Sequence, residues 1–476
     1  MASNPVSELS FDTRILPVNT GDLGRFEDPR TLETWTLPTD RRTLNPLRIA
    51  AKHLSETSIP VGFPTETVYG LGADATRSNA VKGIYKAKGR PSDNPLIIHV
   101  CDLTMLRDLL IPSGQMNGNL AHGDPIPAVY KPLIERFWPG PLTILLPNPK
   151  PSKLAPEVTA GLPTFGARMP SSPLALSLIY LAGVPLAAPS ANASTKPSPT
   201  TAEHVLHDLK GRIEIILDGG ACQVGVESTV VDGLCDPPVV LRPGGVSIDD
   251  IRQCKGWSAV VKGYKDQSEI GASAPRAPGM KYKHYSPKAK VVLYEPGSLK
   301  DPSGIPLEVW RIIEAKEQRL AHLGYEILGR PAVIGIVSTK NWQNWAGFHN
   351  AKWSREERPK NICTNILNVK KLKSPNSYKI QKGELWQGNL PTEDSPHGED
   401  EVPDSWDSPD KERVADIIEI SLGKETKDIA HGLFSALREL DLRGVDFIYV
   451  EGIADEGDIA AAVMNRLRKA ATVIEK

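Results

Sequence analysis

The sequence lacks any apolar run close to the roughly 20 residues that a membrane-spanning helix needs, so we expect no membrane insertion. It also lacks a net charge of either sign. Its 56 Lys and Arg residues are balanced by 57 Asp and Glu residues, for a formal net charge of -1. This balance argues against binding of nucleic acid by overall charge, and any anion site must therefore be local.

Cysteine is scarce, and its spacing fits neither a disulfide framework nor a zinc site. There are five cysteines, an odd number, and no pair has C-x-x-C spacing. A reducing compartment fits this pattern best. The first thirty residues lack an apolar signal core and contain several acidic residues, so we interpret them as a poorly ordered extension rather than a targeting peptide.

Several common catalytic motifs are also missing. There is no G-x-x-x-x-G-K-[ST], which excludes a P-loop, and no G-x-S-x-G nucleophile elbow. "GLGADA" at Gly70 to Ala75 fits a dinucleotide fingerprint only weakly, because it follows a polar "TET" instead of a strand end. His204 and His207 lack an evident third metal ligand, so a solvated helix face is the better interpretation.

What is present predicts two α/β (α+β) domains. The length of 476 residues is too great for one ordinary domain. Apolar runs alternate with helical patterns in both parts, and strand-like runs such as "PAVIGIVS" and "DFIYVEG" predict parallel strands in the second. The predicted divisions are an N-terminal extension at 1–46, a first domain at 47–262 with an insertion near 112–127, a linker at 263–290, and a second domain at 291–476 with a disordered acidic insertion near 385–412.

Polar residues of the first domain gather where apolar runs end. Thr65 to Thr67 follow "VGF", Arg168 follows "TFGA", Ser190 and Asn192 follow "PLAAP", and Arg242 follows "VVL". Such strand-end residues commonly converge on one crevice in a sheet protein. One composite ligand site is the economical interpretation.

The segment "YKAKGRPSDNPLIIHV" suggests a site for a polyphosphate. Lys86 and Lys88 end a predicted helix, and Arg90 lies in the following loop. Cations on a rigid loop suit phosphate groups, although solvated cations that complement a helix dipole would give the same pattern. Hydroxyl-rich segments at "PLAAPSANASTKPSPT" and "VGVESTVVDG" favour the anion site, while Thr200 or Thr201 could simply cap the next helix.

The order of these segments along the chain resembles that of the YrdC-domain family. The resemblance is to the long form of the family, which synthesises threonylcarbamoyl-AMP and has a C-terminal extension domain. The resemblance rests on "PTETVYGLGADA", "KGRPSDNPLIIHV", "WPGPLTILL", "FGARMP", "APSANASTKPSPT", "VESTVVD", "LRPGG" and "APGMKYKHYSP". It implies a YrdC-like twisted mixed sheet with helices, followed by a smaller Rossmann-like α/β domain.

The resemblance also implies an activity. The enzyme would join L-threonine, bicarbonate and ATP, with magnesium, into threonylcarbamoyl-adenylate and pyrophosphate. The product would pass to a complex that transfers the threonylcarbamoyl group to tRNA, with room for weak tRNA binding by the enzyme itself. The implied location is the cytoplasm, and a mitochondrial fraction stays open.

The family's functional residues carry over to positions of this sequence. The implied threonine pocket is made of Thr67, His99, Arg168, Ala188 and Ser228. The implied ATP contacts are Arg90, Asn94, Thr164, Ser190, Ser198 and Arg242, with Tyr282 or Tyr285 closing over the site. The implied catalytic cations are Lys88 and Arg90. Arg168 could clamp the threonine carboxylate. On this interpretation "TET" is the substrate end and "GLG" is a turn.

The linker "APGMKYKHYSP" contains glycine for bending and two tyrosines that could cover a base, which suits a lid, although a passive tether is the alternative. Two rival functions remain. One is a module that binds RNA by its backbone without catalysis, which local cations would permit. The other is a carbamoyl-transferring enzyme that uses carbamoyl phosphate.

Overall fold

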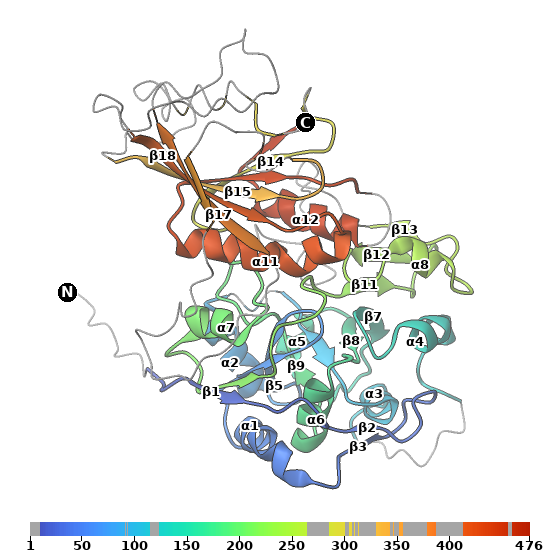
Figure 1. Ribbon diagram of the computed structural model, residues 1–476. Helices are drawn as coiled ribbons and strands as arrows, with labels where there is room; N and C mark the ends of the chain where they lie inside the picture. The colour runs from blue at the N-terminus through green and yellow to red at the C-terminus, as the bar shows by residue number, and fades with distance from the viewer. Residues whose placement is uncertain are drawn as a thin grey trace, which may run out of the picture. The chain divides into compact units, whose positions relative to one another are not determined.

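The computed structural model (Figure 1) places two compact units, the first made of residues 1–285 and 455–469 and the second of residues 286–454 and 470–476. The residues it describes are 10–90, 92, 94–114, 123–263, 285–299, 304–306, 309, 313, 330–342, 346, 352–355, 378–386, 413–455 and 459–476. In this part of the chain no helix is both long and apolar enough to cross a membrane.

The first unit is built on a mixed sheet with the strand order β1-β10-β4-β5-β9-β6-β8-β7-β11-β12-β13. Its strands are β1 (Arg14–Pro17), β4 (Val61–Pro64), β5 (Tyr69–Asp74), β6 (Ile97–His99), β7 (Leu142–Pro147), β8 (Thr164–Arg168), β9 (Leu186–Ala187), β10 (Ile215–Asp218), β11 (Thr229–Asp232), β12 (Val239–Arg242) and β13 (Val261–Lys262), with the separate pair β2 (Arg25–Phe26) and β3 (Trp35–Thr36). Strands β6 and β8 run parallel in a register that pairs His99 with Arg168.

The helices of the first unit are η1 (Arg41–Leu44), α1 (Asn45–Glu56), α2 (Ser78–Lys88), α3 (Leu103–Leu109), η3 (Ala128–Tyr130), α4 (Lys131–Phe137), α5 (Pro156–Thr159), α6 (Pro173–Ala182), α7 (Ala202–Leu209), α8 (Ile248–Arg252) and α12 (Ala460–Ala470, with Ala470 in the second unit). Local signals set several ends. Thr201 accepts a hydrogen bond from the His204 amide and so caps α7. Gly89, with φ of 62°, ends α2 in the left-handed conformation that glycine tolerates.

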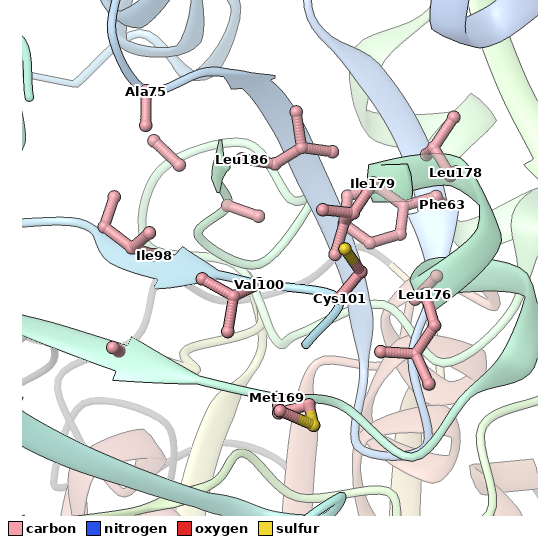
Figure 2. Packing of buried hydrophobic residues seen from close by; sticks show 14 of the residues in the cluster. Phe63, Ala75, Ile98, Val100, Cys101, Met169, Leu176, Leu178, Ile179 and Leu186 are labelled. Atoms are coloured by element: carbon pink, nitrogen blue, oxygen red, sulfur yellow. The ribbon is translucent and has the colours of Figure 1, made fainter. Parts of the chain in front are cut away.

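An apolar core between the sheet and its helices holds the first unit together. Phe63 of β4, Val100 after β6, and Leu176 and Ile179 of α6 are all buried in one cluster, part of which is shown in Figure 2. Cys101 belongs to the same cluster. This packing fixes the strands whose ends carry the polar residues discussed below.

The prediction that "GLG" forms a turn is wrong. Gly70 and Gly72 lie inside β5, which pairs antiparallel with β4. The reason for glycine here is close packing: a Cβ at Gly72 would lie 2.7 Å from the ring of Phe63, and one at Gly70 would lie 3.2 Å from it. The glycines make room for an aromatic side chain of the neighbouring strand, and they lie in a strand instead of a turn.

The expected disorder of the first thirty residues is also wrong from residue 10 onward. Strand β1 joins the sheet of the first unit, where Ile15 and Leu16 pair with Ile216 and Leu217 of β10. Trp35 of β3 is buried, and its indole donates a 2.9 Å hydrogen bond to Ser177 of α6. The segment is short of long apolar runs, but a few apolar side chains packed on the core are enough to order it.

The second unit has a sheet with the order β16-β17-β18-β15-β19-β14-β20. Its elements are β14 (Lys290–Tyr294), β15 (Ala332–Ser338), β16 (Lys352–Arg355), β17 (Lys379–Trp386), β18 (Arg413–Ser421), α11 (Thr426–Leu442), β19 (Phe447–Glu451) and β20 (Val473–Glu475). In this order, the neighbouring strands β18, β15, β19, β14 and β20 pair in parallel, as predicted. Strands β16 and β17 add an antiparallel edge.

Some predictions fall on residues outside those described. They are most of the linker at 264–284, which includes Tyr282, the insertion at 115–122, and the acidic segment at 387–412. Leu385 and Trp386, which we assigned to the start of that acidic insertion, instead end β17.

Candidate active site

A pocket opens in the first unit where strand ends and loops meet. About 710 Å³ of space not occupied by atoms lies within it, and part of that space is open to solvent. Among the residues predicted for the site, those that line it are Thr67, Arg90, His99, Arg168, Ala188, Ser190, Ser198, Ser228, Arg242 and Tyr285. The composite site expected from strand-end polar residues is therefore one cavity in the structure.

Arg168, the last residue of β8, forms one corner of the pocket. Its side chain is buried, and its guanidinium donates a 2.9 Å hydrogen bond to Thr67 Oγ1. The same guanidinium lies 2.8 Å from a carboxylate oxygen of Glu66, which also accepts the Ser171 amide. Its Nε has no hydrogen-bond partner in the described part of the chain. The side chain is thus held from one side and still presents an unused buried donor, as a carboxylate-binding arginine would.

The "TET" segment that follows β4 is folded as a tight turn. Thr65 Oγ1 donates to the carbonyl of Val68 at 2.7 Å and lies 2.8 Å from Thr67 Oγ1. These bonds orient the Thr67 hydroxyl toward Arg168. The turn therefore supplies a fixed hydroxyl beside a fixed cation.

His99, the last residue of β6, is neutral at physiological pH. Burial, and then the positive charge of Arg168, lower its pKa from 6.5 to about 3. Its Nδ1 is buried, and no residue that the structure describes forms a hydrogen bond with it. A neutral imidazole with an unmatched ring nitrogen adds a second polar atom that a ligand could satisfy.

A second cation, Arg242, lies at the end of β12. Its Nη2 donates to Ser228, at 2.8 Å to the carbonyl and 3.1 Å to the hydroxyl, and Ser228 in turn contacts Thr143 at 2.8 Å. Burial lowers the pKa of Arg242 to about 10, partly offset by the carboxylate of Glu227, so the guanidinium remains charged at neutral pH. The pocket therefore holds positive charge on separate strands.

Lys88 supports the pocket wall instead of lining it. Its ammonium donates to the carbonyls of Ser190 and Asn192, the second at 2.7 Å. The Ser190 hydroxyl donates to the side-chain oxygen of Asn192 at 2.6 Å, which completes a small network. In the same loop Thr195 has φ of 75°, a left-handed backbone that costs a non-glycine residue about 1–3 kcal/mol.

Two further predicted residues do not line the pocket. Asn94 is fully buried, and neither atom of its side-chain amide has a hydrogen-bond partner. Thr164 begins β8 and so lies at the opposite end of that strand from Arg168. The structure therefore does not bring Thr164 together with the pocket residues.

Tyr285 is the linker tyrosine that the structure describes. It lines the pocket and is buried, and its φ of 65° is again in the left-handed region. Burial, and then the negative charge of Glu227, raise its pKa to about 12. A strained backbone that is held in place at a pocket is a common property of functional positions.

Two charged residues at the site were missed by the sequence analysis. Glu227 lies in the segment "VGVESTVVDG", which the sequence analysis uses only for its hydroxyl groups, and Arg466 of α12 lies in none of the segments assigned to the site. Their side chains form an ion pair at 2.9 Å, although 239 residues separate them in sequence. No local pattern around Arg466 distinguishes it from other basic residues on an amphipathic helix.

Two family models match the chain. The model described as "Telomere recombination" matches residues 56–244. The model described as "Threonylcarbamoyl-AMP synthase, C-terminal domain" matches residues 246–472, a range that includes α12.

Proteins named threonylcarbamoyl-AMP synthase resemble the chain over most of its length. The protein of Schizosaccharomyces pombe is 42% identical over 445 residues, which are 91% of this chain and 90% of that protein. The protein of Bacillus subtilis is 39% identical over 437 residues, which are 91% of this chain and 95% of that protein.

Solved structures of Sua5 from Pyrococcus abyssi match the fold. The crystal structure of that protein complexed with L-threonine is 33% identical, has a TM-score of 0.61, and is matched over 97% of this chain and 99% of that one. A structure of a variant of the same protein has a TM-score of 0.63 at 32% identity, over 97% of this chain and 98% of that one. The predicted fold class, a mixed α/β sheet domain followed by a second α/β unit, is confirmed.

Proposed function

The chain belongs to the threonylcarbamoyl-AMP synthase family, in the form with a C-terminal domain, and we propose that its pocket converts L-threonine, bicarbonate and ATP into threonylcarbamoyl-AMP and pyrophosphate. One observation supports this most directly. A buried arginine with an unused donor opens into the same pocket as Arg242 of another strand and Arg90 of a loop, which suits an amino-acid carboxylate beside a polyphosphate.

We assign the threonine end to the corner around Arg168. The guanidinium would bind the threonine carboxylate through its buried Nε, while Glu66 and Thr67 hold it from behind. Ser228 and the neutral His99 would meet the remaining polar groups of threonine. L-Threonine is the ligand named for the Pyrococcus abyssi structure, which supports this choice of amino acid.

We assign the ATP end to Arg90 and Arg242, with Ser190 and Ser198 as hydroxyl donors and Tyr285 covering the nucleotide. Asn94 stays a predicted ATP contact, since its buried amide has no partner among the described residues and such a group is costly unless a ligand satisfies it. Lys88 holds the carbonyls of Ser190 and Asn192, so a direct contact with phosphate would require it to exchange those bonds. Thr164 stays a predicted ATP contact.

The proposed chemistry is a nucleotidyl transfer without a covalent enzyme intermediate. The threonine amine attacks bicarbonate and forms a C–N bond while a C–O bond breaks and water leaves, which gives a carbamate. One carbamate oxygen then attacks the α-phosphorus of ATP, and the bond from that phosphorus to pyrophosphate breaks. Negative charge grows on the leaving pyrophosphate, where Arg90 and Arg242 would stabilise it. Because a carbamate decomposes readily, closing the site against water by the linker and Tyr285 would protect it.

Magnesium would enter with ATP. Among the residues described there is no group of three His, Cys, Asp or Glu side chains that could hold a metal ion. Mg²⁺ commonly keeps several waters and binds through substrate phosphates with few protein ligands. We therefore treat MgATP as the substrate and assign no protein ligand to the metal.

We further propose that the product passes to a complex that modifies tRNA, and that the enzyme works in the cytoplasm. Weak binding of tRNA by the enzyme itself is compatible with local cations such as Lys86, but the balanced overall charge favours no strong binding.

The test is release of pyrophosphate from ATP, with threonine and bicarbonate each omitted in turn. Wild-type protein should need both. Arg168→Ala should raise the KM for threonine by roughly 100-fold or more, because a buried, charge-assisted contact to the carboxylate is lost. Arg242→Ala should act mainly on ATP.

The rival functions predict other outcomes. Release that ignores threonine but responds to carbamoyl phosphate would identify the carbamoyl-phosphate enzyme. No release, together with salt-sensitive binding of double-stranded RNA, would identify the RNA-binding module.

A further inference from the structure

Glu227 places a negative charge in the wall of a pocket that is proposed to bind ATP. The side chain lines the pocket together with Ser198, Arg242 and Tyr285. A buried carboxylate without compensation is costly, and it would repel the phosphates of ATP. Something must therefore neutralise Glu227 without occupying the pocket.

Arg466 of α12 meets this requirement. Its side chain is fully buried, its Nε donates to a Glu227 carboxylate oxygen at 2.9 Å, and its Nη1 donates to the Pro243 carbonyl at 2.6 Å. Its guanidinium also lies 5.9 Å from the centre of the Tyr285 ring. Arg466 does not line the pocket, so it acts through the residues that do.

The contacts of Arg466 reach the proposed ATP site along two routes. Glu227 uses its other oxygen to accept a 2.5 Å hydrogen bond from the Ser198 hydroxyl, so the carboxylate connects Arg466 to a predicted ATP contact. Pro243 directly follows Arg242, so the bond to its carbonyl fixes the chain beside the second predicted contact. Arg242 is another cation whose charge acts on the Glu227 carboxylate.

We propose that Arg466 is a positioning residue of the ATP site: it holds Glu227 against Ser198 and neutralises it, so that the charge of Arg242 acts on the phosphates and not on Glu227. This inference rests on the proposed function. It assigns to α12, which matches the C-terminal family model, a direct part in building the nucleotide half of the pocket.

The same contacts predict a pH effect. The groups that face Glu227 are Arg466, Arg242, Ser198 and Tyr285. Burial acts to raise the pKa of Glu227, but Arg466 and then Arg242 overcome it and lower the pKa to about 2. Without Arg466, less positive charge opposes the effect of burial on Glu227. The pKa of Glu227 therefore rises, and its carboxylate takes up a proton at higher pH than before.

The experiment compares Arg466→Met with Arg466→Lys and a control in the same helix. The control is Arg468→Met, because Arg468 is also largely buried and pairs with Asp455 outside the pocket. Pyrophosphate release is measured against ATP, against threonine and against pH, and thermal unfolding is recorded for each variant.

We expect Arg466→Met to lower kcat/KM for ATP by about 10- to 100-fold, as misplaced site residues do, with little change in the KM for threonine. The acid limb of its pH profile should move to higher pH. Arg466→Lys should recover part of the loss because an ammonium still pairs with Glu227, and Arg468→Met should resemble wild type.

Two results would overturn the inference. One is an Arg466→Met variant with the kinetics and pH profile of Arg468→Met. The other is an equal loss for ATP and threonine, which would indicate a general structural effect. An inactive wild-type protein would count against the proposed function instead. If Arg466→Met does not fold, Glu227→Gln carries the test, and an unchanged pH profile with unchanged ATP kinetics in that variant would reject the inference.

Discussion

Single residues of the first unit carry buried polar atoms that have no hydrogen-bond partner among the residues that the structure describes. They include the side-chain amide of Asn94, Nδ1 of His99 and Nε of Arg168. Each such atom costs free energy in the folded protein unless a partner arrives. Since His99 and Arg168 line the pocket, a bound substrate is the natural partner, and this cost is one that binding would relieve.

Asn94 allows this idea to be tested against a matched residue. Asn94→Ala removes an unsatisfied amide, so we expect no loss of unfolding free energy in the absence of ligand, while the KM for ATP rises. Asn192→Ala removes an amide that bonds to the carbonyls of Ala193 and Lys196 and accepts from Ser190, and should cost about 1–3 kcal/mol. Urea unfolding checks both, and an equal loss in the two variants would contradict the argument.

His99 should make stability depend on pH. Its pKa is about 3 in the folded protein against 6.5 in the unfolded chain, so the unfolded state binds the extra proton between these values. The stability that His99 contributes is therefore complete above pH 6.5 and falls as the pH is lowered toward 3. His99→Gln should flatten this part of the curve in urea unfolding at a series of pH values. A slope identical to that of wild type would show that His99 is not the source.

Much of the pocket lining could be predicted from sequence, and the reason is local. Thr67, Arg168 and Arg242 each stand where an apolar run stops, so their own neighbourhood reveals them. Arg466 has no such mark. Its importance depends on a partner 239 residues away, and no periodicity or spacing encodes that contact. For the linker tyrosine at the site, the sequence predicted either Tyr282 or Tyr285 and did not distinguish between them.

At the scale of elements, β5 shows why a glycine pattern misled. Gly70 and Gly72 alternate along one face of the strand, where the Phe63 ring of β4 occupies the space of their side chains. Two closely spaced glycines in a sequence are typical of a turn. The cause is instead an aromatic side chain in a different segment, which becomes visible only once the strands are paired.

Substitution in β5 should follow the two distances. Gly72→Ala puts a methyl group 2.7 Å from the Phe63 ring, and overpacking of a buried core typically costs about 1–3 kcal/mol. Gly70→Ala, at 3.2 Å, should cost less. Adding Phe63→Leu should recover part of the loss in the Gly72 variant by removing the ring. Thermal unfolding measures all three, and equal losses at Gly70 and Gly72 would contradict the packing explanation.

At the scale of the whole molecule, the first unit is not one continuous stretch of chain. It takes in residues 455–469, which follow most of the second unit in sequence, and those residues bring Arg466 to Glu227. The two apolar-patterned regions were enough to predict two domains. They did not predict that a helix of the later region is counted with the earlier one, because an amphipathic face does not specify what covers it.

Because of this ion pair, Glu227→Gln should have opposite effects on stability in the wild-type protein and in the Arg466→Met variant. In the otherwise wild-type protein, Glu227→Gln leaves a buried guanidinium without its counter-charge and should destabilise by about 3–5 kcal/mol. In an Arg466→Met background, the same substitution removes a carboxylate that has lost its principal partner, and it should restore stability. Urea unfolding of the two single variants and the double variant measures this coupling. Strictly additive losses would mean that the pair contributes nothing.

The place of α12 in the sequence also affects how the protein is made. The ribosome synthesises the strands that carry Arg168 and Arg242 long before it reaches Arg466. The nascent chain therefore contains Glu227 without its counter-charge while all of residues 286–454 are synthesised. Contacts this far apart in sequence close slowly, because a long loop must be ordered first. The pocket therefore acquires its final charge only after the second unit has been translated, and adenylation before that moment would be poorly supported.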